Sequence, residues 1–217
     1  MINERFPKDL RVALAVTGFR ANIVVKRPLL EALFNIVPVA RAKAEPLEHE
    51  SASWMDSASG LREALENPDN KHKVWEASAN RALFTDAASA LMLIVASELE
   101  RLFRETSVSL FNRGESTYAP NICVARAVWS LANQYKHLGE WRQNPDQSRA
   151  DKAIVRTLVD DEMRADAAAE FLKRGGYREY HLFENALISC SDNIVGDGSI
   201  PASGRAGMPV VTMTSVP

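Results

Sequence analysis

The chain has 217 residues, of which 46% are hydrophobic and 25% are charged, an ordinary composition for a soluble globular protein. A single hydrophobic core can hold most of a chain of this length. The formal net charge of −2 and the isoelectric point near 6.1 exclude a protein that attracts nucleic acid through a global basic field. Any contact with RNA or DNA must therefore be local, or be made by one face or by an oligomer.

The cysteines and the apolar segments predict a cytoplasmic protein that makes no contact with a membrane. Cys123 and Cys190 lie far apart in the sequence and form no metal-type or redox-type pair, so free buried thiols are expected. The N-terminal sequence MINERFPKDL has acidic residues and a proline where a signal peptide needs an apolar run. The most apolar stretch, residues 87–96, is about half the length of a membrane span, so we interpret it as part of a core helix.

Helical patterns begin in the first third of the chain. Residues 10–25 are rich in β-branched side chains and fit either a strand or a helix. Pro28 suits a first helical turn, so residues 27–45 are predicted to form a helix that is kinked or interrupted at Pro38. A further short helix is expected over residues 54–66, where the sequence NPDN ends it.

The two longest helical signals lie in the middle of the chain. Apolar residues recur every three and four positions over residues 74–105, and the centre of this segment is apolar nearly all round, as in the innermost helix of a bundle. The next helix is expected over residues 120–139, because Gly139 suits a helix end. These two helices should form the central antiparallel pair of the fold.

The last third of the chain predicts shorter elements. Residues 149–174 indicate one helix or two shorter ones, and residues 178–190 indicate one more amphipathic helix. Residues 191–217 are rich in Gly, Ser and Pro and are predicted to form a flexible or surface-lying tail, with PVVTMTSV as a candidate edge strand. The predicted fold class is therefore all-α: an antiparallel helical bundle with two long central helices, a single domain over residues 1–190 and an irregular C-terminal tail.

The helix predicted over residues 120–139 has two opposite stripes, since each residue advances about 100° around the axis. The stripe that should face the core consists of Val124, Val128, Leu131, Tyr135 and Leu138. The opposite, polar stripe consists of Arg126, Ser130, Asn133, His137 and Glu140. Tryptophans at positions 129 and 141 flank the polar stripe, which suggests that another helix, a second subunit or a ligand covers it.

The segment NQYKHLGEW, residues 133–141, together with the upstream Arg126, resembles the HEPN superfamily. These are small all-α domains, and many are metal-independent endoribonucleases of toxin–antitoxin or phage-defence systems. Asn133, Lys136 and His137 match the Asn-x-x-Lys-His form of the family's motif as they stand. The family's arginine normally lies closer to the histidine than Arg126 does, and members that bind without catalysis are plentiful.

The resemblance implies a metal-independent endoribonuclease without a cofactor. His137 would act as general base or acid, and Lys136 or Arg126 would stabilise the charge that develops on the phosphate. Asn133 would orient the histidine or the phosphate. The implied partners are RNA, an antitoxin protein and a second copy of the chain in a homodimer. The alternative, which the displaced arginine favours, is a catalytically inactive helical module that binds protein or nucleic acid and dimerises.

Two features of the structure should separate these alternatives. Catalysis is favoured if Arg126 and His137 face a common cleft with room for a phosphate. Binding is favoured if Glu140 pairs with Lys136 and a neighbouring helix covers the polar stripe. A metal site is a weaker hypothesis, since the acidic residues over 160–170 have no histidine at ligand spacing and are better interpreted as a solvated helix face.

Overall fold

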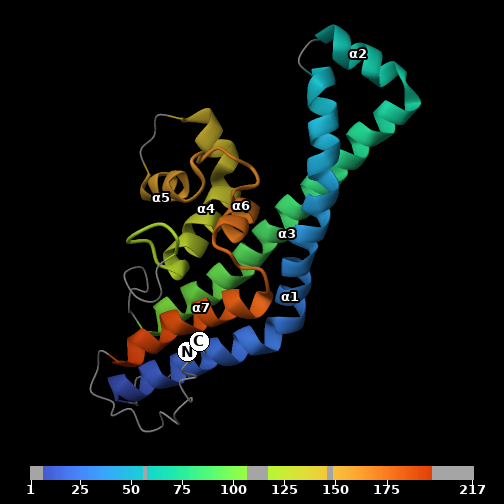
Figure 1. The fold of residues 1–217 in the computed structure, drawn as a ribbon. Helices are drawn as coiled ribbons and strands as arrows, with labels where there is room; N and C mark the ends of the chain where they lie inside the picture. Colours follow the sequence, from blue (N-terminus) through green and yellow to red (C-terminus); the bar gives the residue numbers. More distant parts are fainter. Residues whose placement is uncertain (1–6, 56–57, 107–116, 146–148, 197–217) are drawn as a thin grey trace, which may run out of the picture.

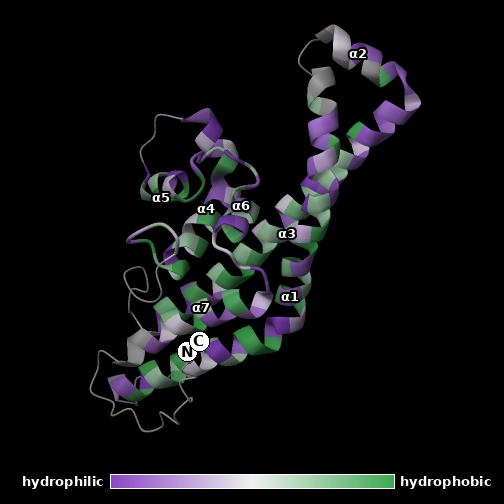
Figure 2. Cartoon of the chain, viewed as in Figure 1, coloured by the Kyte–Doolittle hydropathy of each residue, from purple (hydrophilic) through white to green (hydrophobic). Residues whose placement is uncertain are grey.

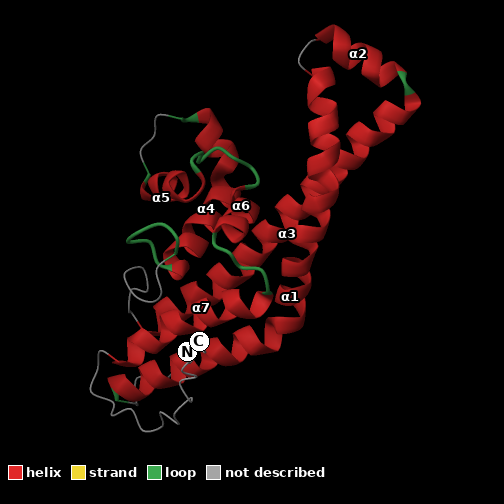
Figure 3. Cartoon of the chain, viewed as in Figure 1, coloured by secondary structure: helices red, strands yellow, loops and turns green. Residues whose placement is uncertain are grey.

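Every regular element of the described chain is an α-helix, which confirms the predicted fold class (Figures 1 and 3). The computed structural model describes residues 7–55, 58–106, 117–145 and 149–196. Within these ranges the helices are α1 (Lys8–Met55), α2 (Ala58–Glu66), α3 (Pro68–Thr106), α4 (Val124–Gln143), α5 (Ala150–Val159), α6 (Ala167–Arg174) and α7 (Tyr180–Gly196).

Helix α1 is continuous over 48 residues and settles the N-terminal ambiguity in favour of a helix. The predicted helix over residues 27–45 is confirmed as part of α1, but its start at Pro28 and an interruption at Pro38 are wrong, because both prolines and Pro46 lie inside α1. Of the two alternatives at Pro38, only a kink remains. Each proline removes one backbone donor, and α1 bends as it passes along the bundle (Figure 1). Packing offsets this loss, since the inner face of α1 is at most 3% exposed at Phe19, Ile23, Leu30 and Phe34.

The central pair of the bundle is α1 and α3, which pack against each other more extensively than any other two helices. The predicted central pair, now α3 and α4, is therefore wrong, although these two helices also pack against each other. Helix α3 has an 18-residue window apolar enough to cross a membrane, and 56% of that window is buried inside the protein. Figure 2 shows this hydrophobic part of α3 among the other helices, as is typical of a bundle's central helix.

The second half of α1, together with α2 and the first half of α3, forms an arm that projects from the rest of the bundle (Figure 1). Ion pairs tie its two long helices together, with Lys73 Nζ 2.6 Å from Glu50 Oε1 and Arg81 Nη1 2.9 Å from Glu48 Oε1. The predicted stop at NPDN, residues 67–70, is correct, and the same sequence starts α3. The side-chain Oδ1 of Asn67 accepts a hydrogen bond from the backbone N–H of Asp69.

The predicted region 149–174 forms two helices, α5 and α6, as one of the two alternatives proposed. Helix α5 ends at Val159 and is capped by Asp160, whose φ of 66° places it in the left-handed region. Helix α7 runs to Gly196, six residues into the predicted tail, and Arg20 Nε of α1 donates a hydrogen bond to Ser191 Oγ at 3.0 Å. The candidate edge strand PVVTMTSV lies outside the described residues.

Candidate functional site

Helix α4 carries the candidate motif and extends beyond its predicted end at Gly139 to Gln143. Gly139 lies inside the helix, and the chain leaves it only at Asn144, whose N–H donates to the carbonyl of Glu140 at 3.0 Å. Lys152 of α5 holds the end of α4 by donating from Nζ to the carbonyl of Asn144 at 2.9 Å. Contacts with α5 therefore outweigh the helix-ending tendency of glycine.

The predicted inner stripe of α4 is correct in its first half, whereas in its second half Leu138 is half-buried and Tyr135 is exposed. Val124, Val128 and Leu131 are at most 1% exposed, whereas Tyr135 is 40% exposed. In the second half of the helix the buried side is occupied instead by Gln134, at 1% exposure, whose Nε2 donates to the carbonyl of Arg164 at 2.6 Å. The buried face of α4 therefore turns from α3 toward the α5–α6 connection.

Asp151, in the first turn of α5, contacts three side chains of the N-terminal part of the polar stripe. Its Oδ1 accepts a hydrogen bond from Ser130 Oγ at 2.8 Å, and its Oδ2 accepts one from Asn133 Nδ2 at 3.0 Å. Arg126 Nη2 lies 3.5 Å from the same Oδ1. The structure thus brings Arg126 and Asn133 together, but it does so around a carboxylate of the chain itself.

His137 belongs to a second cluster at the other end of the stripe. Its Nδ1 lies 3.3 Å from Glu140 Oε2, and Arg149 Nη2 lies 3.5 Å from the same oxygen. The His137 side chain is 40% exposed, and Lys136 is exposed on the surface of α4. Glu140 therefore lies beside His137 and Arg149, although His137 Nδ1 forms no hydrogen bond within the described residues, and no ion pair joins Glu140 to Lys136 there.

The two tryptophans are covered from within the chain to different extents. Trp141 is 1% exposed, and Lys152 Nζ lies 5.8 Å from the centroid of its ring. Trp129 is half-buried and packs against the core. Of the three predicted ways to cover these tryptophans, another helix is confirmed for Trp141, because α5 covers it.

The acidic residues over 160–170 do not form the solvated helix face that the sequence favoured, because Glu162 and Asp166 are buried and paired with arginines. Arg156 Nε donates to Glu162 Oε2 at 2.7 Å, and this hydrogen bond lowers the pKa of Glu162. Burial raises the pKa of Asp166, but Arg164, whose Nε is 2.6 Å from Oδ1, lowers it by more. Across the described ranges, no group of three or more His, Cys, Asp or Glu side chains is placed to hold a metal ion.

Three functionally placed side chains were missed by the sequence interpretation: Asp151, Gln134 and Lys152. The sequence does contain a signal for an acceptor such as Asp151. Ser130 and Asn133 are hydrogen-bond donors on the same side of the helix as Arg126, and donors on a covered helix face need an acceptor from the covering element. Nothing local in the sequence marks Lys152, which is only 6% exposed, as the residue that holds the end of α4.

No family model, no curated protein and no solved structure matches the chain. The site is therefore interpreted from its own geometry.

Proposed function

We propose that the chain is a catalytically inactive helical module that docks a second copy of itself through the outer face of α1. The observation that carries the proposal is that α1 is apolar on two opposite sides. One side is buried in the bundle, and the other leaves Val25, Leu29 and Val39 exposed by 76%, 53% and 59%. A helix that is apolar on both sides is normally covered on both.

The outer face combines a projection with a groove. A groove of about 260 Å³ lies between α1 and α3, and its apolar lining includes Ala32, Ile36, Val39 and Leu83. Leu29 stands one turn before this groove on the same helix and projects into solvent. A projecting apolar side chain and an apolar groove beside it can serve as the two halves of one contact.

A two-fold axis between Ala32 and Ile36 would satisfy both halves at once. In such an isologous interface, Leu29 of each chain enters the groove of the other, so residue i meets residue j and j meets i. The small side chain of Ala32 allows two bent helices to approach closely where they cross. The self-complementary arrangement of this face is the reason that we propose a second copy as the partner.

The arrangement around Asp151 supports a function without catalysis. Arg126 and Asn133, which would have to bind a phosphate, are both directed at this carboxylate. A phosphate entering there would meet a like charge, and displacing Asp151 would leave the buried Ser130 hydroxyl without its acceptor.

The oligomeric state tests the proposal directly. We expect the wild-type protein to show twice the chain mass of 24.0 kDa in light scattering after size-exclusion chromatography. Leu29→Glu should give the monomer mass with an unchanged helical circular dichroism spectrum. The matched control is Leu182→Glu, which alters a 42% exposed leucine on α7 and should remain dimeric. A monomeric wild-type protein, or a dimeric Leu29→Glu variant, contradicts the proposal.

A second candidate function, an HEPN-like endoribonuclease, is favoured by one observation: Lys136 and a partly exposed His137 lie side by side on the surface of α4. In this proposal His137 transfers a proton and Lys136 stabilises the phosphate of an RNA substrate, and an antitoxin protein restrains the activity. Induced expression in cells should then arrest growth, and His137→Ala should abolish the arrest and the cleavage of an RNA pool. Equal growth of both strains and intact RNA remove this candidate.

A further inference from the structure

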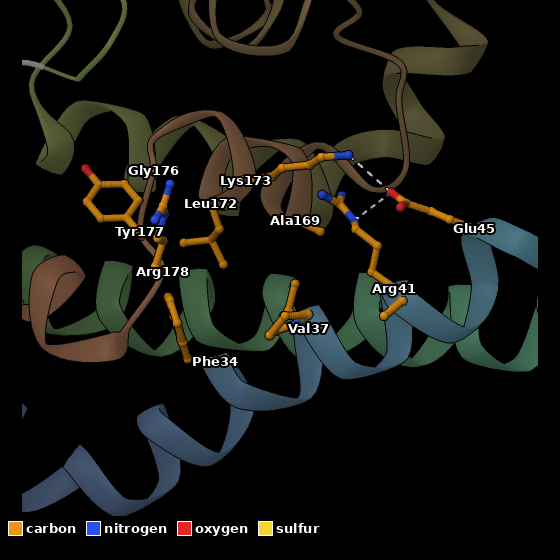
Figure 4. Close-up of a pocket in the computed structure, with 12 residues that line it drawn as sticks. Phe34, Val37, Arg41, Glu45, Ala169, Leu172, Lys173, Gly176, Tyr177 and Arg178 are labelled. Carbon is orange, nitrogen blue, oxygen red and sulfur yellow. Dashed lines mark hydrogen bonds and ion pairs between the residues drawn. The ribbon is translucent and has the colours of Figure 1, made fainter.

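A cavity of about 510 Å³ lies between the inner side of α1 and the segment that joins α6 to α7. Its middle is apolar, with Phe34, Val37 and Leu172 grouped together (Figure 4). The volume falls within the range of pockets that hold small organic ligands, and such pockets typically combine apolar walls with a few polar groups. Because it lies on the opposite side of α1 from Val39, this cavity does not depend on the proposed dimer.

Two consecutive glycines, of which Gly176 lines the cavity, precede Tyr177 and Arg178. Gly176 has a φ of +68°, a conformation that side chains with a Cβ rarely adopt. A Cβ on Gly175 would come within 2.5 Å of Tyr177 Cε2, so the tyrosine ring can pack there only against a glycine. The glycine pair thus lets Tyr177 and Arg178 turn to one end of the cavity, where Figure 4 shows them.

The cationic groups at the two ends of the cavity differ in their partners. At one end Lys173 Nζ lies 3.2 Å from Glu45 Oε1, and Arg41 Nε lies 3.8 Å from the same oxygen (Figure 4). Arg41 Nη2 is also 3.5 Å from Glu170 Oε2. At the other end Arg178 is exposed and makes no ion pair with any residue that the structure describes. Arg178 is therefore the cation available to an incoming anion.

A buried hydroxyl without a hydrogen-bond partner belongs to a second cavity that Arg178 also lines. This cavity has a volume of about 220 Å³, and Tyr180 lines it together with Arg178. Tyr180 is 4% exposed, and its Oη has no hydrogen-bond partner among the described residues. Burial raises the pKa of this phenol, so its hydroxyl remains a donor at physiological pH. A buried donor without an acceptor is unfavourable and indicates a missing partner.

Three carboxylates line the smaller cavity, Glu31, Glu179 and Glu184, and the last two have neighbouring side chains as partners. Glu184, which is 2% exposed, accepts hydrogen bonds from Arg27 Nε at 3.0 Å and Nη2 at 2.6 Å. Glu179 Oε2 lies 3.1 Å from His181 Nδ1. The junction of the two cavities therefore offers a free arginine and a free phenol donor next to an apolar surface.

We infer that this junction binds a small monocarboxylate with an apolar body. The carboxylate accepts hydrogen bonds from the Arg178 guanidinium and the Tyr180 hydroxyl, and the apolar body lies along Phe34, Val37 and Leu172. An arginine beside a neutral donor suits the two oxygens of a carboxylate, and the adjoining apolar lining selects against short, fully hydrated acids.

Calorimetric titration of the full-length protein with hexanoate, octanoate and octanamide tests the inference. We expect saturable binding of octanoate, with the dissociation constant falling about fourfold for each methylene added from hexanoate. Octanamide, which has the same body without the charge, should bind at least about tenfold more weakly. Arg178→Gln should weaken octanoate binding by about tenfold or more, and Tyr180→Phe by about fivefold.

The matched control is Arg62→Gln, which removes an exposed arginine on α2 and should leave octanoate binding unchanged. Thermal unfolding of each variant verifies that it is folded before titration. The inference is overturned if octanoate does not bind, if octanamide binds as tightly, or if Arg178→Gln and Arg62→Gln bind octanoate alike.

Discussion

Replacing Asp151 by alanine should destabilise the protein strongly, because one carboxylate holds three side chains of α4. Hydrogen bonds to a charged group each contribute about 1.5–3 kcal/mol, and the fully buried hydroxyl of Ser130 would lose its acceptor. The contact with Arg126 adds little, because it is long at 3.5 Å and both side chains are more than 20% exposed. We therefore expect Asp151→Ala to lower the free energy of unfolding by about 2–4 kcal/mol.

Urea unfolding at neutral pH, followed by circular dichroism, measures this change through the transition midpoint. The matched control is Asp86→Ala, which removes an exposed carboxylate of α3 and should change the free energy of unfolding by less than about 0.5 kcal/mol. If the two variants unfold at the same urea concentration, the interpretation of the polar stripe as a structural contact with α5 is refuted.

Two further predictions concern acid stability and the glycine turn. Burial raises the pKa of Glu98, but hydrogen bonds from Lys26 and Asn22 lower it by more, below its usual 4.5. The charged Glu98 thus contributes stability above pH 4.5 that is lost as the pH falls through its folded pKa. The urea midpoint of Glu98→Gln should therefore fall less steeply below pH 4.5 than that of the wild-type protein. The control Glu63→Gln, at an exposed position of α2, should behave like the wild-type protein. Gly176→Ala should lower the free energy of unfolding by about 1–2 kcal/mol because of the positive φ, whereas Gly139→Ala, in open space inside α4, should raise it by about 0.5–1 kcal/mol. Equal unfolding midpoints for the two glycine variants would contradict the assignment of the turn.

Local patterns in the sequence predict the helices of this protein better than their pairing. The break between α2 and α3 follows from Asn67 and its following proline, which form a helix stop and a helix start. The continuity of α1 through Pro28 and Pro38 does not follow from local preference, because it depends on packing against α3. The pairing of α1 with α3 was missed for the same reason, since periodicity gives the buried face of a helix but not its neighbour.

The candidate site shows the same limit at the level of side chains. Periodicity places Arg126, Asn133 and His137 on one side of α4, and the structure agrees for Arg126 and Asn133, which meet at Asp151. The side chain that covers this side is Asp151 of α5, and the spacing of residues along α4 does not predict it. The exposure of Tyr135 has a similar cause, since Gln134 binds the α5–α6 connection and turns the buried face of α4.

The central claim is a two-fold contact in which Leu29 of each chain enters the groove lined by Val39 of the other. Sedimentation equilibrium on complementary variants tests this contact most directly. Leu29→Glu alters the projecting side chain, and Val39→Lys alters the groove, so each variant alone should sediment with the chain mass of 24.0 kDa. Mixed in equal amounts at about 100 μM, they should form a dimer, because one contact gains an opposite-charge pair and the other keeps the native residues. A mixture that remains monomeric, or a wild-type protein that sediments as a monomer, contradicts the account.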